Sequence, residues 1–146
     1  MANAARAIII QGDKMLLMHR NKDGKTYYTL VGGRLQENES PEQALAREVK
    51  EETGLDVTSC RLVYIEEHAE PYNRQYIFTC EIAPHGGVAI QEASEEALMN
   101  KFTTNIHQPL WVNTSAFGTL PFNTAQLQTA IVRDLKKGFP DVPTTL

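Results

Sequence analysis

The chain has 146 residues, a formal net charge of −4 and no lysine- or arginine-rich run. Its length fits one domain with a buried core, and its 42% hydrophobic and 22% charged residues are ordinary for a globular protein. The negative charge argues against a nucleic-acid polymer as a partner, so an anionic substrate would need a metal ion to bridge it to the protein.

The N-terminal half begins with two predicted strands and a third that leads into a glycine loop. Ala5–Ile10 and Met15–His19 have the pattern of a hairpin across a turn centred on Gly12. The apolar stretch in the first strand is too short for a signal peptide, and no stretch approaches membrane-spanning length. Tyr27–Val31 is predicted to be the third strand, which feeds Gly32 and Gly33.

A short helix follows the glycine loop, and local signals mark both of its ends. Ser40 is a good N-cap residue, Pro41 suits the first helical position, and Gln43 completes a capping box with Ser40. Gly54 is the expected left-handed residue just past the end, and Leu55 follows it as a hydrophobic closure. The pattern therefore predicts a helix that begins at Pro41 and ends at Thr53.

At about 100° per residue, this helix separates into three arcs. The arc predicted to be buried holds Leu45, Ala46, Val49 and Thr53. The water-facing arc holds Gln43, Arg47 and Lys50. Glu48, Glu51 and Glu52 form an arc beside the apolar one, where like charges repel one another. Helical geometry alone leaves two readings open, a solvated acidic face and a cation-binding site at the rim of the core.

After the helix, strands alternate with turns until a final helix. The predicted elements are strands at Arg61–Glu67, Gln75–Ile82 and Leu110–Val112, a long irregular segment at Ala83–Thr104 with a short helix near Ala97, and a helix at Gln126–Lys136. Strands flanked by helices favour an α/β fold, a mixed β-sheet covered on both faces as an α/β/α sandwich. Cys60 and Cys80 have no metal-ligand spacing, which favours buried free thiols and a cytoplasmic protein.

The segment from Gly33 to Leu55 resembles the Nudix box, the signature of the Nudix hydrolases. That box is a glycine, five residues, a glutamate, seven residues and then Arg-Glu-apolar-x-Glu-Glu-x-Gly-apolar. Its fixed positions are filled here by Gly33, Glu39, Arg47, Glu48, Val49, Glu51, Glu52, Gly54 and Leu55. Two details differ from many members, since Val31 stands where a proline is common and Asn38 where a glycine is common. Asn38 can replace glycine in a left-handed turn.

The resemblance implies one Nudix domain over residues 1–146, with the α/β/α fold expected above. It also implies hydrolysis of a nucleoside diphosphate linked to another moiety, with Mg²⁺ or, as a substitute, Mn²⁺. Glu48, Glu51 and Glu52 would then be catalytic metal ligands, because Mg²⁺ prefers oxygen donors. The supporting residues in this reading are Arg47, which would orient the glutamates, Glu39, which would serve the metal or the loop, and Gly33, which would let backbone approach the metal.

Three matters stay open at this stage. The general base is either a box glutamate or an acid from a later loop, where Glu95 and Glu96 are the candidates for an extra base or ligand. No substrate-binding residue is assigned, although Arg20 and Arg34 could meet phosphate, and no histidine is assigned to a metal. The irregular segment after Ile82 could form a lid or a homodimer contact.

The function itself has three readings. The leading one is a pyrophosphohydrolase that acts on a nucleotide sugar or on ADP-ribose. A nucleoside triphosphate pyrophosphohydrolase that sanitises nucleotides would use the same box with a different pocket. A catalytically silent nucleotide-binding module would be expected to lose box acids, whereas this chain keeps all of them.

Overall fold

The computed structural model describes residues 2–88, 100 and 104–146. In chain order, its elements are β1 (Ala4–Gln11), β2 (Lys14–Lys22), β3 (Lys25–Thr29), β4 (Val31–Arg34), α1 (Pro41–Thr53), β5 (Val57–Glu67), β6 (Arg74–Ile82), β7 (Asn105–Asn113), the 3-10 helix η1 (Thr114–Thr119), α3 (Ala125–Lys137) and β8 (Thr144–Thr145). Within these ranges, none of the helices has the length and apolar character needed to cross a membrane.

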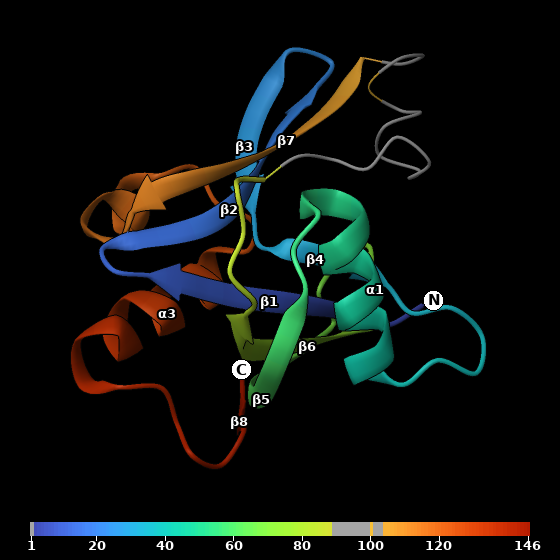
Figure 1. Cartoon of the computed structure of the whole chain (residues 1–146), viewed down its shortest axis with the longest axis vertical. Coiled ribbons are helices and arrows are strands. Elements are labelled where there is room, and N and C mark those ends of the chain that lie inside the picture. The colour runs from blue at the N-terminus through green and yellow to red at the C-terminus, as the bar shows by residue number, and fades with distance from the viewer. Residues whose placement is uncertain (1, 89–99, 101–103) are drawn as a thin grey trace.

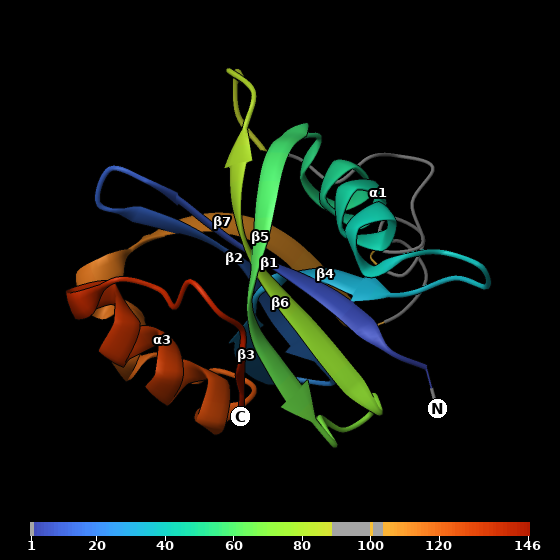
Figure 2. The same cartoon turned by 90° about the horizontal axis from the view of Figure 1, so that it is seen from below.

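The strands form a mixed sheet in the order β3-β2-β1-β6-β5-β8, with β4 paired to β1 and β7 paired to β2. β1 runs parallel to β6 and antiparallel to β2 and β4. Helices α1 and α3 lie on opposite sides of the sheet (Figures 1 and 2). This arrangement confirms the predicted α/β/α sandwich.

The core lies on both faces of β1, because successive side chains of a strand point to opposite sides. Ala5, Ala7 and Ile9 pack in one cluster with Leu45 of α1. Ile8 belongs to the other cluster, which includes buried residues of α3. The sheet is therefore held between two apolar layers, and α1 is fixed against β1 and β4.

Two of the predicted strands differ from the structure in their pairing, length or place in the order. The predicted strand Tyr27–Val31 is divided at Leu30 into β3, which pairs with β2, and β4, which pairs with β1. The strand predicted at Leu110–Val112 extends from Asn105 to Asn113 because it pairs along the whole of β2. It is also not the last strand, since β8 follows α3 and pairs with β5. The short helix predicted near Ala97 lies outside the described residues.

Candidate active site

The site is built on α1, whose ends are those that the sequence predicts. The Ser40 hydroxyl accepts a hydrogen bond from the Gln43 backbone N–H at 3.1 Å, and Gln43 Oε1 accepts one from the Ser40 backbone N–H at 2.9 Å. Gly54 has the left-handed conformation, with φ 78°. These caps fix where the helix begins and ends, and so they fix the direction in which each glutamate points.

The buried face of α1 differs from the prediction. Ala46 is exposed and Ala44 takes its place in the core, while Glu48 and Glu52 are only 7% and 3% exposed. Glu51 stays at the surface edge of the helix, with 36% of its side chain exposed. Leu45, Val49 and Thr53 are buried as predicted, whereas two of the acids that were expected at the rim of the core pack inward beside them. Two of the three acids lie inside the protein.

The glycines of β4 explain how the two acids can be buried. The Gly32 N–H donates a hydrogen bond to Glu52 Oε1 at 2.6 Å. A Cβ atom built on Gly33 would lie 2.7 to 2.9 Å from the carboxylate atoms of Glu48, which is closer than real contacts allow. The carboxylate of Glu48 therefore occupies the space that any side chain at position 33 would fill. The predicted approach of the Gly33 backbone to a metal stays a prediction, whereas its closeness to the Glu48 carboxylate is a feature of the structure.

Helical spacing places Arg47 on the water-facing arc, but its guanidinium lies among the acids, as the box resemblance leads us to expect. It donates to Glu39 at 2.7 and 3.0 Å, to Glu48 at 3.0 Å and to Glu51 at 3.3 Å. It also donates to the backbone carbonyl of Arg34 at 3.0 Å. The hydrogen bond from Arg47 is the main reason that the pKa of Glu39 lies below its usual value. Arg47 thus holds acids of the loop and the helix in one cluster, which offsets their repulsion.

Glu39 braces the loop that leads into α1. Its Oε1 accepts a hydrogen bond from the Gln36 backbone N–H at 2.8 Å, and its Oε2 accepts the short bond from Arg47. Asn38 adopts the expected left-handed conformation with φ 64°. Of the two roles predicted for Glu39, these contacts support the one in the loop, and a role as a metal ligand stays a prediction.

Glu48 and Glu52 line a cavity of about 190 Å³, which we call the acidic cavity. Its remaining lining residues are Arg6, Met18, Arg20, Thr29, Gly32, Gly33, Arg34, Tyr72 and His107. Within the part of the chain that the structure describes, no three His, Cys, Asp or Glu side chains are already grouped as a metal site. Mg²⁺ is usually held by only one or two carboxylates together with substrate phosphates. The two buried carboxylates and the close backbone at Gly33 therefore fit such an ion.

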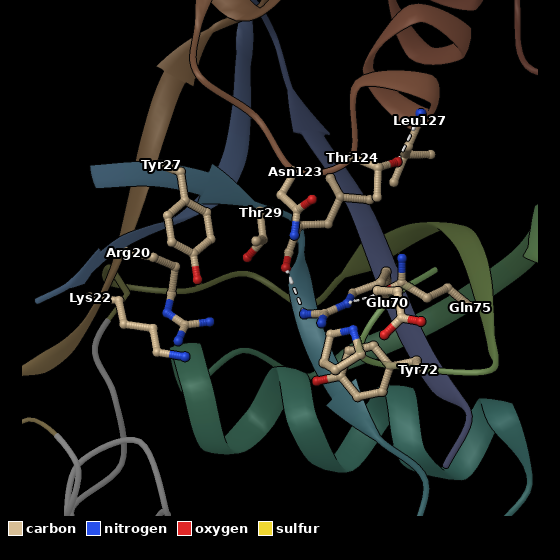
Figure 3. Close-up of a pocket in the computed structure, with 13 residues that line it drawn as sticks. Arg20, Lys22, Tyr27, Thr29, Glu70, Tyr72, Gln75, Asn123, Thr124 and Leu127 are labelled. Carbon is tan, nitrogen blue, oxygen red and sulfur yellow. Dashed lines mark hydrogen bonds between the residues drawn. The ribbon is translucent and has the colours of Figure 1, made fainter. Parts of the chain in front are cut away.

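A second cavity, of about 210 Å³, adjoins the first, and we call it the polar cavity. The two share the lining residues Arg6, Arg20, Thr29 and Tyr72. Figure 3 shows aromatic rings and amide side chains gathered around the polar cavity from β3, the β5–β6 turn, β6 and the segment just before α3. The labelled rings and amides are those of Tyr27, Tyr72, Gln75 and Asn123.

A chain of hydrogen bonds runs along the wall of the polar cavity to the glycine strand. The Thr124 hydroxyl and the Gln75 amide both donate to the buried carboxylate of Glu66, the latter at 2.9 Å. Arg6 Nε donates to Gln75 Oε1 at 2.9 Å, and Arg6 Nη1 donates to the Gly32 carbonyl at 3.1 Å. This chain connects the start of α3 to the residue whose N–H holds Glu52.

Sequence reasoning missed several residues of the two cavities. Arg6, Gln75, His107 and Asn123 come from four separate segments, and only the strand pairing brings them together. The available signal was the period-2 alternation of β1 and β7, which places Arg6 and His107 on definite faces. Arg20 and Arg34, which were suggested for phosphate, do line the acidic cavity. Glu95 and Glu96 lie outside the described residues, so their predicted role stays a prediction.

Comparison with known proteins agrees with the box and the fold. The family model of the NUDIX domain matches residues 1–117, most of the chain. The chain belongs to the NUDIX family. The solved ADP-ribose pyrophosphatase of Streptococcus suis superposes with a TM-score of 0.67 and 22% identity, over 99% of this chain and 98% of that one. At that identity the likeness confirms the fold.

Curated relatives differ in the substrates that their names give. An 8-oxo-dGTP diphosphatase of Proteus vulgaris is 49% identical over 45 residues, 31% of this chain and 40% of that protein. The NAD-capped RNA hydrolase NudC of Vibrio atlanticus (strain LGP32) is 35% identical over 89 residues, 60% of this chain and 32% of that protein. The chain thus matches less than half the length of both. A Bacillus subtilis (strain 168) protein, provisionally named for 8-oxo-dGTP diphosphatase activity, is 27% identical over 142 residues, 97% of this chain and 85% of that protein.

Proposed function

We propose that this chain is a metal-dependent pyrophosphohydrolase that cleaves the diphosphate of a nucleoside diphosphate linked to another moiety. The observation that carries the proposal is the junction of the two cavities. Buried carboxylates line one cavity, and rings, amides and cations line the other. A diphosphate bound through metal in the acidic cavity would place its nucleoside in the polar cavity.

In this proposal, Glu48 and Glu52 hold Mg²⁺ or Mn²⁺ from the wall of the acidic cavity, and Glu51 assists from the exposed edge of the helix. The bound ion would neutralise charge on the diphosphate and lower the pKa of an attacking water molecule. The chain's own part is to keep these carboxylates in place. Arg47 does so through hydrogen bonds to Glu48 and Glu51, and the Gly32 N–H does so through Glu52.

The polar cavity suits the nucleoside end because its walls offer both flat rings and hydrogen-bonding edges. Tyr27 and Tyr72 line it, and guanidinium groups lie over both rings, Arg20 at 5.6 Å from the first centroid and Arg6 at 5.5 Å from the second. The Asn123 amide can donate to and accept from the edge of a base. These groups support a nucleotide-derived small molecule as the substrate.

The identity of the group beyond the diphosphate has two candidates. A sugar or a ribose, as in a nucleotide sugar or ADP-ribose, is the one that the box resemblance first suggested. A further phosphate, as in a nucleoside triphosphate, is favoured by a different observation, namely that two relatives carry names for 8-oxo-dGTP hydrolysis, one of them matched over 97% of this chain.

Product analysis tests both the reaction and the substrate. The purified protein is incubated with Mg²⁺ and then with Mn²⁺ on a panel of nucleotide sugars, ADP-ribose, dinucleoside polyphosphates and nucleoside triphosphates, including oxidised guanine nucleotides. Phosphate is detected after added pyrophosphatase or phosphatase, which identifies the bond that was cleaved. Metal-dependent turnover of one class supports the proposal and selects the candidate. A chain that binds nucleotide but turns over nothing in the panel would instead be a silent binding module.

A double variant tests which residue is the general base. Replacing Glu95 and Glu96 with glutamine should slow turnover if that segment supplies a base or an extra ligand. An unchanged rate would confine the chemistry to the residues of the box.

A further inference from the structure

His107 is a buried side chain of the acidic cavity to which sequence reasoning gave no role. It is 8% exposed and lines the cavity together with Glu48 and Glu52. Its Nδ1 is buried and has no hydrogen-bond partner within the described residues, although the imidazole also interacts with the Asn105 backbone. A buried polar atom without a partner costs free energy, so such atoms in native proteins call for an explanation. One explanation is that a bound ligand supplies the missing hydrogen-bond partner.

The backbone of His107 is hydrogen-bonded on one edge of its strand and faces β2 on the other. It pairs with Arg20 in the antiparallel register of β2 and β7. On the other edge, the Asn100 side chain accepts a hydrogen bond from the His107 N–H at 2.7 Å and donates one to the His107 carbonyl at 2.8 Å. These contacts hold the strand that carries the imidazole in the cavity wall, as expected of a residue that positions a ligand.

Arg20, the cross-strand partner, has the same feature. Its Nε is buried without a hydrogen-bond partner among the described residues, while its Nη2 is anchored on Asn105 Oδ1 at 2.7 Å. In the described part of the chain, neither Arg20 nor Arg6 makes an ion pair with a carboxylate. Burial and the nearby guanidinium of Arg20 lower the pKa of His107 to about 4, so its imidazole is neutral at pH 7.

We propose that Arg20 and His107 together hold the phosphate group that carries the nucleoside. Arg20 lines both cavities and His107 only the acidic one, so the pair stands where a substrate would pass from one cavity to the other. A phosphate offers several acceptor oxygens to a guanidinium and to an imidazole N–H at once. This inference rests on the proposed function. It adds His107 as a phosphate-positioning residue beside Arg20, which the sequence already suggested for phosphate.

Binding of a nucleoside and of its 5′-monophosphate separates the phosphate contact from the rest of the site. Adenosine, guanosine and their monophosphates are titrated into the protein with Mg²⁺ in a calorimeter, because none of them has an anhydride bond to cleave. In the wild-type protein, the monophosphate of the preferred base should bind roughly 10- to 100-fold more tightly than the nucleoside, as expected for hydrogen bonds to a charged group. His107→Leu and Arg20→Met should each lose most of that preference.

Two further variants separate a ligand contact from a structural one. His107→Asn places an amide near the position of Nδ1 and should restore part of the preference. His19→Leu is the matched control, because His19 precedes Arg20 on β2, has its ring tilted against that of Tyr28 and lines neither cavity. It should keep the wild-type preference. A cooperative thermal transition in His107→Leu shows that any loss of the preference is not a loss of the fold.

The results of these binding experiments separate a failure of this inference from a failure of the proposed function. A His107→Leu protein that keeps the full preference for monophosphate would overturn the inference alone, as would a wild-type protein that binds nucleoside and monophosphate equally. Binding of neither compound, with no turnover of any substrate in the panel, would overturn the proposed function and this inference with it.

Discussion

Replacing Gly33 with alanine should damage the chemistry while sparing the fold. The φ of Gly33 lies outside the left-handed region, and the atoms that a Cβ would meet belong to the Glu48 carboxylate, at 2.7 to 2.9 Å. To restore ordinary contact, that carboxylate must move by roughly 0.7 Å. A side-chain end can move this far cheaply, so the free energy of unfolding should change by less than about 1 kcal/mol.

The same shift is large for catalysis, because a misplacement of about 1 Å can cost roughly 100-fold in rate. We therefore expect kcat/KM of Gly33→Ala to fall roughly 10- to 100-fold. The neighbouring substitution Gly32→Ala should instead destabilise the fold. Its Cβ would lie 2.0 Å from the backbone oxygen of Ala5, and its φ of +135° is strained for any side chain. That substitution should cost about 2–5 kcal/mol of stability.

Urea unfolding followed by the fluorescence of the single tryptophan, Trp111, measures the stability of each variant, and steady-state kinetics on the best substrate of the panel measures activity. Gly86→Ala is the matched control, because a Cβ at Gly86 meets nothing within 4 Å. Full activity of a folded Gly33→Ala protein would refute the reasoning, since it would show that the position of Glu48 against the glycine strand does not matter.

Three other predictions concern charge. The double variant Glu51→Gln with Glu52→Gln should lower turnover by orders of magnitude without unfolding the protein, because the helix loses repulsion and a glutamine oxygen can still accept from the glycine strand. Addition of a chelator should abolish turnover, and Mg²⁺ or Mn²⁺ should restore it. Asp134→Asn should cost about 1–3 kcal/mol of stability at pH 7, because Asp134 is buried and accepts hydrogen bonds from Arg133 and Tyr64. Those bonds, with Arg133 foremost, lower the pKa of Asp134, so its contribution is present above the ordinary aspartate pKa and is lost as the pH falls through the lowered value.

Each of these three predictions has a result that would contradict it. Metal-dependent turnover that survives the double glutamine variant would remove the assigned carboxylates from the metal site. Turnover that persists in excess chelator would remove the metal from the mechanism. Thermal unfolding across pH 2 to 7 tests the contribution of Asp134 to stability. The control is Asp141→Asn, because Asp141 is exposed. A difference between wild type and Asp134→Asn that stays constant over this range would contradict the role given to its charge.

The sequence was sufficient for α1 because the signals for a helix are local. Ser40, Gln43 and Gly54 act on backbone groups within a few residues of themselves, so the predicted and observed ends agree. The fold class was also predictable, since alternating strands and helices have few stable layered arrangements. The strand at Tyr27–Val31 was misjudged because apolar pattern does not reveal that its two halves pair with different neighbours.

By itself the sequence determined that three glutamates would lie close together on one side of a short helix, since this follows from helical spacing alone. Only the tertiary structure decided that Glu48 and Glu52 are buried, because burial depends on the bare backbone of β4 packed against that helix. It also decided that Arg47 reaches Glu39 and the Arg34 carbonyl of the preceding loop. The placing of His107 beside Glu48 and Glu52 was likewise decided by the pairing of β7 with β2, segments that are far apart in the chain. Spacing within one element is a property of the chain, whereas contact between elements depends on the packing of the whole sheet.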